Sequence, residues 1–270
     1  YLLTRRWFGG KARRIHSALV SEKLPVGDGA MVWLVTVEYS GGEPETYLLP
    51  VAIAVGERAE SLLKESPRAA IARLRRGGDL GVLHDAVWSE SFRASLLQAV
   101  CRRRTLRGLS GQAAGTPFRP LRRLLGKVEE PLPSTLLGAD QSNTSIVYGN
   151  RLMLKLFRRL EEGVNPDVEI GVHLTERTAF ANFPAVAGSL EYRAVQGEPR
   201  TLGVLEAFVP NEGNARRYTL QTLGRYFERA LARRSGPPAE LLPRGSPLAL
   251  CTDEVQAAAG DVLGTYLEAA

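Results

Sequence analysis

The dipeptide Gly149-Asn150 most constrains the fold of this chain, because it separates two short apolar runs. Glycine and asparagine tolerate the positive φ angles that a two-residue turn requires, so the dipeptide predicts a β-hairpin. Its strands would cover residues 146–148 and 151–157. A polar stretch precedes the hairpin, and a helix-like segment follows it. The chain therefore belongs to a class in which strands and helices both contribute, and we expect an α+β fold.

Three strand-like segments, residues 15–24, 31–39 and 46–54, lie near the start and are separated by glycine-containing turns. Along the second segment, Val32, Leu34, Thr36 and Glu38 fall on one side of a strand, and Trp33, Val35, Val37 and Tyr39 fall on the other. A helix follows that Ser89 can cap. Its apolar face carries Phe92, Leu96 and Val100. The first hundred residues therefore predict a small α+β unit.

Glycine and proline content divides the chain further. Residues 105–135 are rich in both, which predicts a linker containing one short helix. Residues 1–104 would precede this linker, residues 136–212 would form a second unit, and residues 213–270 would supply two long helices. The last predicted helix, residues 252–270, has no glycine cap, and the chain lacks an initial methionine. We therefore expect a piece of a longer protein.

Composition excludes several classes of protein. Apolar residues make up 44% of the 270 residues and charged residues 24%, which argues against a disordered chain. Two cysteines, Cys101 and Cys251, are too few for a disulfide scaffold and indicate reduced thiols of a cytoplasmic protein. No apolar run approaches the roughly 20 residues of a membrane helix, and no signal peptide is visible. We expect no membrane partner.

The net charge of +6 is the main argument for a nucleic-acid partner. Only five of the 35 basic residues are lysines, and the arginines occur in short groups scattered along the chain. They form no single basic block and do not alternate with aromatic residues. We therefore expect no nucleic-acid partner, although binding on charge alone remains an alternative that a steep salt dependence would support.

The order of motifs between residues 137 and 176 is typical of a kinase-like N-lobe. A polar turn comes first, then the hairpin, and Lys155 lies in the middle of the following strand. Asn165 and Pro166 then begin a helix that carries Glu169. A polar turn can offer amides and hydroxyls to a triphosphate. A lysine on a rigid strand can meet the α- and β-phosphates, and a glutamate on the adjoining helix can hold that lysine.

Segments downstream of this helix fit the same lobe. Residues 184–193 and 201–208 predict strands, and residues 206–209 lead into a loop where a hinge would contact adenine through its backbone. Residues 215–233 predict a helix with Leu223, Phe227 and Leu231 on one face. Each of these signals also occurs in ordinary sheets and helices, so the order of the motifs, rather than any one of them, favours a phosphotransferase.

With these motifs in place, the chain resembles bacterial maltokinases and the maltokinase-like C-terminal domain fused to some trehalose synthases. The resemblance covers nearly the whole chain, and the polar turn before the lysine strand is its most specific motif. It is carried by residues 6–11, 140–145, 154–159, 165–169, 187–192 and 206–209.

The resemblance implies an ATP-dependent kinase that forms maltose 1-phosphate from maltose with Mg²⁺, in a route from trehalose to α-glucans such as glycogen. It also implies an N-terminal cap subdomain, a kinase-like N-lobe and a helical C-lobe similar to that of aminoglycoside phosphotransferases. Lys155 would be the ATP lysine, Glu169 its partner, and a trehalose synthase a possible partner protein. The ATP-binding residues implied are Gln141, Ser142, Asn143, Thr144, Ser145, Lys155, Glu169, Glu206, Ala207, Phe208 and Val209.

One departure from the family concerns catalysis. The family's His-Gly-Asp type motif, which supplies the base, is missing, as is the acidic metal-binding motif after it. The three histidines are His16, His84 and His173, and His84-Asp85 is expected to mark a helix start. We expect the catalytic base and the Mg²⁺ ligands to follow Ala270 and the 270 residues alone to be inactive. Two further alternatives stay open: a non-catalytic kinase-fold module of a trehalose synthase fusion, and another small-molecule phosphotransferase, of the aminoglycoside or choline type.

Overall fold

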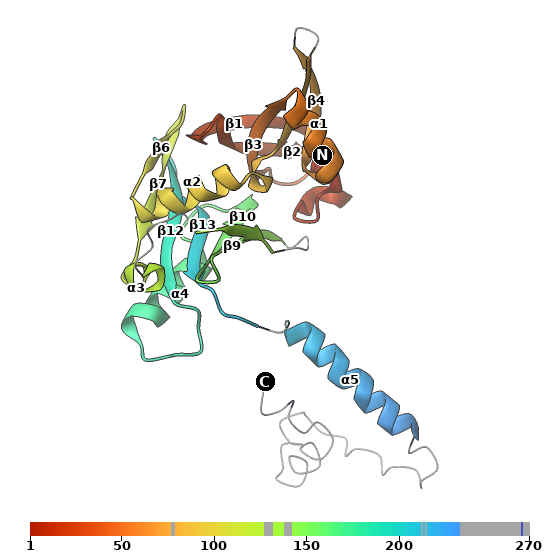
Figure 1. Cartoon of the computed structure of the whole chain (residues 1–270), viewed down its shortest axis with the longest axis vertical. Helices are drawn as coiled ribbons and strands as arrows, with labels where there is room; N and C mark the ends of the chain where they lie inside the picture. Colours follow the sequence, from red (N-terminus) through yellow and green to blue (C-terminus); the bar gives the residue numbers. More distant parts are fainter. Residues whose placement is uncertain are drawn as a thin grey trace. The chain divides into compact units, whose positions relative to one another are not determined.

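Two antiparallel β-sheets make up most of the first compact unit of this chain, which covers Tyr1–Val209 (Figure 1). The second unit covers Pro210–Ala270. The computed structural model describes residues 1–76, 79–126, 132–137, 142–211, 213, 215–232 and 266. Within these ranges no helix is both long enough and apolar enough to cross a membrane.

The first sheet has the strand order β1-β2-β3-β5-β4, with β11 added beside β3. Its three longest strands correspond to the three predicted strands and are slightly longer. In β1, register shifts let the strand continue along β2 past its expected end. The strands are β1 (Ile15–Gly27), β2 (Ala30–Tyr39), β3 (Glu45–Val55), β4 (Ala70–Arg76), β5 (Asp79–Asp85) and β11 (Arg159–Leu160). The helical segments around it are η1 (Leu2–Thr4), η2 (Gly9–Ala12), α1 (Glu57–Glu65), η3 (Pro67–Ala69) and η4 (Ala86–Trp88).

The second sheet has the strand order β6-β7-β12-β13-β10-β9-β8. Its strands are β6 (Thr105–Arg107), β7 (Gly111–Pro117), β8 (Ser134–Leu136), β9 (Asn143–Tyr148), β10 (Leu152–Phe157), β12 (Val186–Ala194) and β13 (Arg200–Ala207). Helices α2 (Glu90–Cys101), α3 (Leu121–Leu125) and α4 (Pro166–Arg177) accompany it. The hairpin between β9 and β10 is confirmed, since Gly149 and Asn150 have φ angles of 54° and 52°. Two successive positive φ angles fit a type I′ turn.

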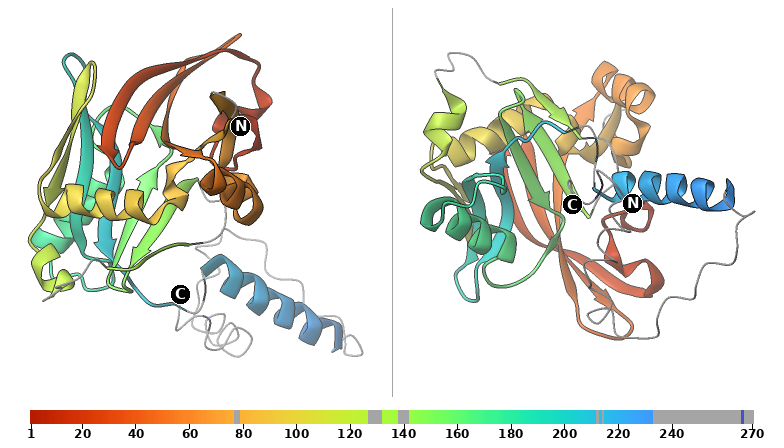
Figure 2. Two further views of the ribbon diagram at one scale, coloured as in Figure 1. Left: turned by 45° about the horizontal axis from the view of Figure 1, so that its top comes forward. Right: turned by 90° about the horizontal axis from the view of Figure 1, so that it is seen from below.

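Helix α2 packs against both sheets and joins them into one core (Figure 2). The predicted apolar face is confirmed, because Phe92, Leu96 and Val100 are buried. They share a cluster with Leu34 of the first sheet and Leu154 of the second. The Ser89 hydroxyl contacts Ser91 and does not cap the helix backbone. Burial of an apolar helix face between two sheets therefore explains why these elements form a single unit.

Residues 105–117 differ from the predicted linker, because they form β6 and β7 at one edge of the second sheet. Gly115 explains the difference. A Cβ atom there would lie 2.1 Å from the carbonyl oxygen of Ala99 in α2, so this glycine allows a helix to approach a strand. The short helix expected in the linker is α3. Along the sequence, the boundary between the two compact units follows Val209 and is close to the boundary predicted at residue 212.

Glu22 connects β1 of the first sheet with the second sheet. Its buried carboxylate accepts hydrogen bonds from the backbone NH groups of Leu109 at 2.6 Å and Ser110 at 2.8 Å, and from the Tyr192 hydroxyl at 2.9 Å. Burial by itself raises the pKa of Glu22, but these hydrogen bonds outweigh it, so the pKa is lowered. Gly108 lies against this carboxylate, and a Cβ atom there would be 2.5 Å from its carbon.

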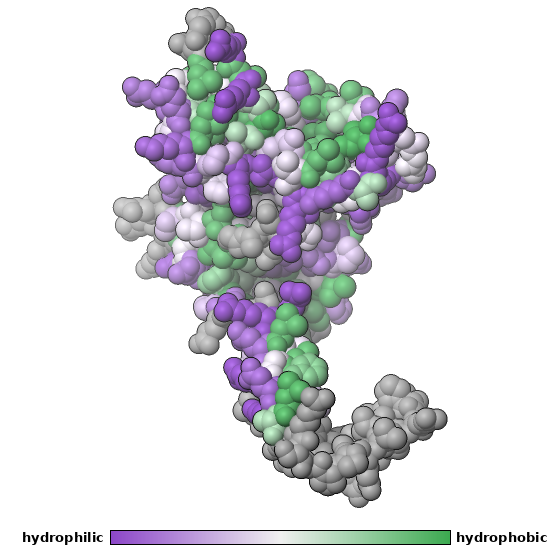
Figure 3. Space-filling view, turned by 90° about the vertical axis from the view of Figure 1, so that its right-hand side faces the viewer, coloured by the Kyte–Doolittle hydropathy of each residue, from purple (hydrophilic) through white to green (hydrophobic). Residues whose placement is uncertain are grey.

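The second unit contains α5 (Ala215–Ala232), close to the helix predicted over residues 215–233. The predicted apolar face of Leu223, Phe227 and Leu231 is exposed, and Figure 3 shows apolar and polar surface side by side along this helix. Tyr218 stacks on Tyr266, with ring centroids 5.6 Å apart. Apart from Tyr266, the helix predicted over residues 252–270 lies outside the described residues.

Candidate functional site

Lys155 lies in the middle of β10, between two neighbouring strands. It is opposite Ser145 of β9 and Val204 of β13. Its neighbours Leu154 and Leu156 point to the other face of the sheet and are fully buried in the core. The lysine side chain remains 28% exposed. The site thus presents an accessible ammonium group on a strand that is held along both edges.

Asp167 is the carboxylate that pairs with Lys155, with Oδ2 3.0 Å from Nζ. It lies in the first turn of α4, where the predicted start is confirmed. Asn165 Oδ1 accepts a hydrogen bond from the Asp167 NH group at 2.9 Å, and Pro166 is the first helical residue. Because both partners are partly exposed, this ion pair contributes at most about 1 kcal/mol and can open at little cost.

The structure corrects the expected pairing of Lys155 with Glu169. Glu169 is exposed and forms no ion pair with any other residue that the structure describes. It lies two positions after Asp167, which is a rotation of about 200° around a helix. Lys155 therefore faces the side of α4 that carries Asp167, and Glu169 points elsewhere. The sequence did offer Asp167 as a candidate partner of Lys155, since this carboxylate directly follows the helix start at Asn165 and Pro166.

Glu206 of β13 is a second carboxylate near Lys155. Strand pairing places it on the same face of the sheet, because Lys155 is opposite Val204, two residues earlier. Its side chain is buried. Burial raises the pKa of Glu206; the Lys155 ammonium group opposes this shift and the Asp167 carboxylate adds to it. The charges of Lys155, Asp167 and Glu206 thus influence one another.

The hinge predicted over residues 206–209 begins in β13 and continues beyond its end. The NH group of Ala207 donates to the carbonyl of Ala185 at 2.8 Å, and the NH group of Phe208 donates to Arg151 at 2.9 Å. These two NH groups are thus engaged within the fold. The segment is held on both sides by the residues that directly precede β12 and β10.

The polar turn before the hairpin lies partly in a strand, which differs from the expected phosphate loop. Asn143, Thr144 and Ser145 belong to β9, paired with Phe157, Leu156 and Lys155 of β10. Ser142 is exposed beside the strand, and Gln141 lies outside the described residues. Thr144 is also fixed through its hydroxyl, which accepts a hydrogen bond from Arg158 Nε at 2.8 Å. Backbone pairing with β10 therefore extends the strand three residues further than the apolar pattern predicted.

A pocket of about 470 Å³ lies between the start of β9 and the start of α4. Asn143 and Thr201 contribute to its wall, as do Asn165 and Asp167 from the helix start. The Asn165 NH group donates to the Thr201 hydroxyl at 3.2 Å, which fixes the helix start against β13. The partner of Lys155 therefore lines a concave surface large enough for a small ligand.

Sequence reasoning missed the buried ion pair of Arg158 and Asp85. Arg158 Nη2 lies 2.8 Å from Asp85 Oδ2, and the two side chains are only 2% and 3% exposed. Asp85 also accepts a hydrogen bond from Val87 NH and so caps η4, which confirms the helix start expected at His84-Asp85. Arg158 follows the lysine strand directly, so the pair connects that strand with the first sheet.

The described residues supply no complete site for a magnesium ion. Across the described ranges, no three His, Cys, Asp or Glu side chains gather closely enough to hold a metal ion. The Lys155 ammonium group is partly exposed, and its ion pair with Asp167 can open at little cost, so it can contact a phosphate.

Comparison with known families identifies the first part of the chain. The family model described as the maltokinase N-terminal cap domain matches residues 1–88. This match agrees, over residues 1–88, with the resemblance noted from the sequence. The matched cap domain ends at η4, just before α2, and contains the whole of β1–β5.

Solved structures similar to the chain include a glucosamine kinase in complex with glucosamine, ADP and inorganic phosphate. The identity is 15% and the TM-score 0.44, over 76% of this chain and 39% of that chain. A second structure of a glucosamine kinase, crystal form B, also gives 15% identity and a TM-score of 0.44, over 78% of this chain and 38% of that chain. The chain therefore spans about two fifths of the length of these proteins.

Proposed function

We propose that this chain provides the cap domain and the ATP-binding lobe of a sugar kinase that phosphorylates maltose to maltose 1-phosphate. One observation carries the proposal. A maltokinase cap domain is followed, in the same chain, by a lysine on a central strand that pairs with a carboxylate of the next helix. In kinases this arrangement positions a lysine against the phosphates of ATP.

Lys155 is the proposed phosphate contact. On nucleotide binding its ammonium group would turn partly from Asp167 to the α- and β-phosphates, while Asp167 keeps it oriented. Ser142, Asn143, Thr144 and Ser145 would lie beside the phosphates, and residues 206–209 would adjoin the adenine. The Asp167 carboxylate repels phosphates and the Lys155 ammonium group attracts them, so nucleotide affinity should depend strongly on Lys155.

We infer that these 270 residues bind the nucleotide but do not transfer its phosphoryl group. Phosphoryl transfer to a sugar needs a base that accepts the hydroxyl proton. No His-Gly-Asp triplet occurs in the sequence, and His84, the only histidine followed by an aspartate, is buried in the cap domain. ATP supplies the transferred group and Mg²⁺ would offset its charge. The proposal also includes maltose as the acceptor and a role in trehalose and α-glucan metabolism. It further includes a trehalose synthase as partner and a cytoplasmic location.

Nucleotide binding to the Lys155→Met variant tests this function. The variant should bind a fluorescent ATP analogue at least about tenfold more weakly than the unchanged chain, because one charge-assisted phosphate contact is lost. Lys64→Met, which removes an exposed lysine of α1, is the matched control and should bind normally. Both variants should unfold within about 1 kcal/mol of the parent chain, since the lost ion pair is partly exposed.

Two outcomes would contradict the proposal. Equal nucleotide affinity of the Lys155→Met variant and the parent chain would remove the assigned role of Lys155. Turnover of ATP with maltose by these 270 residues would refute the proposed inactivity. A coupled assay for ADP release, run with maltose and with glucosamine, also reports on the acceptor.

A further inference from the structure

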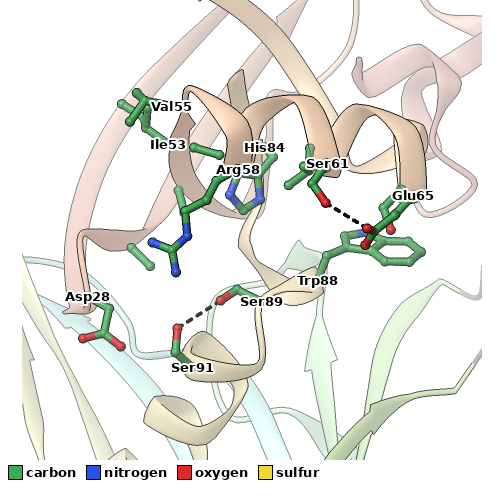
Figure 4. A pocket seen from close by; sticks show the side chains of 15 residues that line it. Asp28, Ile53, Val55, Arg58, Ser61, Glu65, His84, Trp88, Ser89 and Ser91 are labelled. Carbon is green, nitrogen blue, oxygen red and sulfur yellow. Dashed lines mark hydrogen bonds between the residues drawn. The ribbon is translucent and has the colours of Figure 1, made fainter. Parts of the chain in front are cut away.

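A second pocket, about 700 Å³ in volume, is lined mostly by residues of the region that matches the cap domain. It lies between α1 and the chain that leads from β5 through η4 into α2 (Figure 4). None of its lining residues belongs to β9, β10 or α4, so it is separate from the site around Lys155. Its size falls within the range of about 300–1,000 Å³ that is usual for small-molecule sites.

Apolar side chains at this pocket are unusually exposed. Trp88 is 45% exposed, and Ile53 and Val55 at the end of β3 are 61% and 56% exposed. Figure 4 shows the indole of Trp88 below the last turn of α1, next to Glu65. An indole ring offers a flat apolar face and one NH donor at its edge. The pocket therefore combines an aromatic platform with space beside it.

Two basic side chains face the same pocket. His84 is only 6% exposed, and the one hydrogen bond of its ring within the described structure joins Nδ1 to the Asp85 carbonyl at 3.2 Å. His84 is one of the residues that line the pocket (Figure 4). Arg58 extends from α1 toward Ser89 and Ser91 and forms no ion pair with a described residue. Arg58 is exposed, so its guanidinium group can exchange water for the oxygens of a ligand.

Hydroxyl and carboxylate groups complete the lining. Ser61 donates to Glu65 at 2.8 Å, and the hydroxyls of Ser89 and Ser91 are 3.0 Å apart. Asp28 adds a second carboxylate at the other end of the pocket. The two carboxylates disfavour an anion, and Arg58 disfavours a cation. Donors and acceptors in similar number around an aromatic face are suited to a neutral ligand with many hydroxyl groups.

We propose that this pocket of the cap domain binds a neutral saccharide, with one pyranose ring against Trp88. The C–H face of the ring would cover the indole. Hydroxyls of this ring would donate to Glu65, and hydroxyls of further rings of the saccharide would donate to Asp28 and accept from Arg58 and Ser89. This site is additional to the acceptor and nucleotide sites of the proposed kinase, and the proposal does not depend on that function.

Titration of the 270-residue chain with maltotetraose, followed by tryptophan fluorescence and by calorimetry, tests the proposal. We expect binding in the millimolar range, up to about 10 mM. Trp88→Ala should weaken it on the order of tenfold or more, because the central aromatic contact is lost. Arg58→Met should weaken it severalfold, and Trp88→Phe should retain part of the affinity. Leu109→Ala, at an apolar residue 79% exposed elsewhere, is the matched control.

Lys155→Met distinguishes this site from the nucleotide site, since saccharide affinity should be unchanged in that variant. Inorganic phosphate and glucose 1-phosphate are the anionic probes, and both should bind more weakly than the neutral saccharide. The proposal is overturned if maltotetraose does not bind the folded chain or if either anion binds more tightly. Unchanged affinity in the folded Trp88→Ala and Arg58→Met variants would also overturn it.

Discussion

Replacing Asp85 by asparagine should destabilise the first unit strongly, because it leaves the Arg158 guanidinium group buried without a counter-charge. Arg158 is 2% exposed, and its other partners are neutral: the Thr144 hydroxyl at 2.8 Å and the Leu48 carbonyl at 3.5 Å. Removing one partner of a buried ion pair costs about 3–5 kcal/mol. Asparagine still offers an oxygen to the Val87 NH group. We therefore expect a loss at the lower end of that range, about 3 kcal/mol.

Urea unfolding followed by tryptophan fluorescence measures this loss. Trp7 is a suitable reporter, because the Arg158 guanidinium carbon lies 5.1 Å from the centre of its ring. Arg193→Met is the matched control. It removes an arginine whose ion pair with Glu191, at 2.8 Å, is 65% exposed on the arginine side. An exposed pair contributes about 0–1 kcal/mol, so this variant should unfold close to the parent chain.

The double variant Asp85→Asn/Arg158→Met separates the ion pair from other effects of each substitution. Without the Arg158 guanidinium group, loss of the Asp85 charge should cost less stability. The double variant should therefore lose less unfolding free energy than the sum of the losses in the two single variants. A coupling of about 1–3 kcal/mol is expected for groups in direct contact. A loss below about 1 kcal/mol in Asp85→Asn, or no coupling in the cycle, would refute the account of Arg158 as a buried charge that Asp85 neutralises.

Glu22 and Gly108 give two further predictions for the junction between the sheets. The pKa of Glu22 is lowered in the folded chain, so its stabilising contribution is complete above the unfolded value of about 4.3 and is lost as the pH falls through the folded value. Unfolding free energy measured between about pH 5 and pH 3 should therefore fall less steeply in Glu22→Gln than in the parent chain; parallel curves would contradict this. Gly108→Ala should cost about 1–3 kcal/mol, because the added methyl group would lie 2.5 Å from the Glu22 carboxyl carbon. Gly41→Ala, where nothing lies within 4 Å, should be close to neutral in the same unfolding assay.

Local chemistry made much of the fold predictable from the sequence. The turn at Gly149 and Asn150 and the helix start at Asn165 depend only on neighbouring residues, and both are present as expected. Strands β4, β5 and β11 of the first sheet were not predicted, whereas β1, β2 and β3 were predictable because alternation of side chains is a property of each strand by itself. Their small extensions depend on pairing with neighbours, which the pattern of one strand does not contain.

Features that depend on residues distant in the sequence were not predictable. Gly115 suggested a linker, whereas its role is to let α2 approach β7 closely. The partner of Lys155 depends on how α4 is rotated against the sheet, which selects Asp167 over Glu169. The ion pair of Arg158 joins residues 73 positions apart, and neither residue has a local pattern that indicates the other.

The region that matches the cap domain ends earlier in the chain than the compact unit that contains it. The reason is that β11 and α2 both connect this region with the second sheet. The matched region ends at residue 88, but the compact unit continues to Val209. β11, which directly follows the lysine strand and Arg158, pairs with β3 of the cap domain. The α2 helix buries one apolar face against both sheets. Because the strand that carries Lys155 leads straight into the first sheet, the matched region forms part of the support of that strand. Its removal would leave β11 without its partner strand and Arg158 without Asp85.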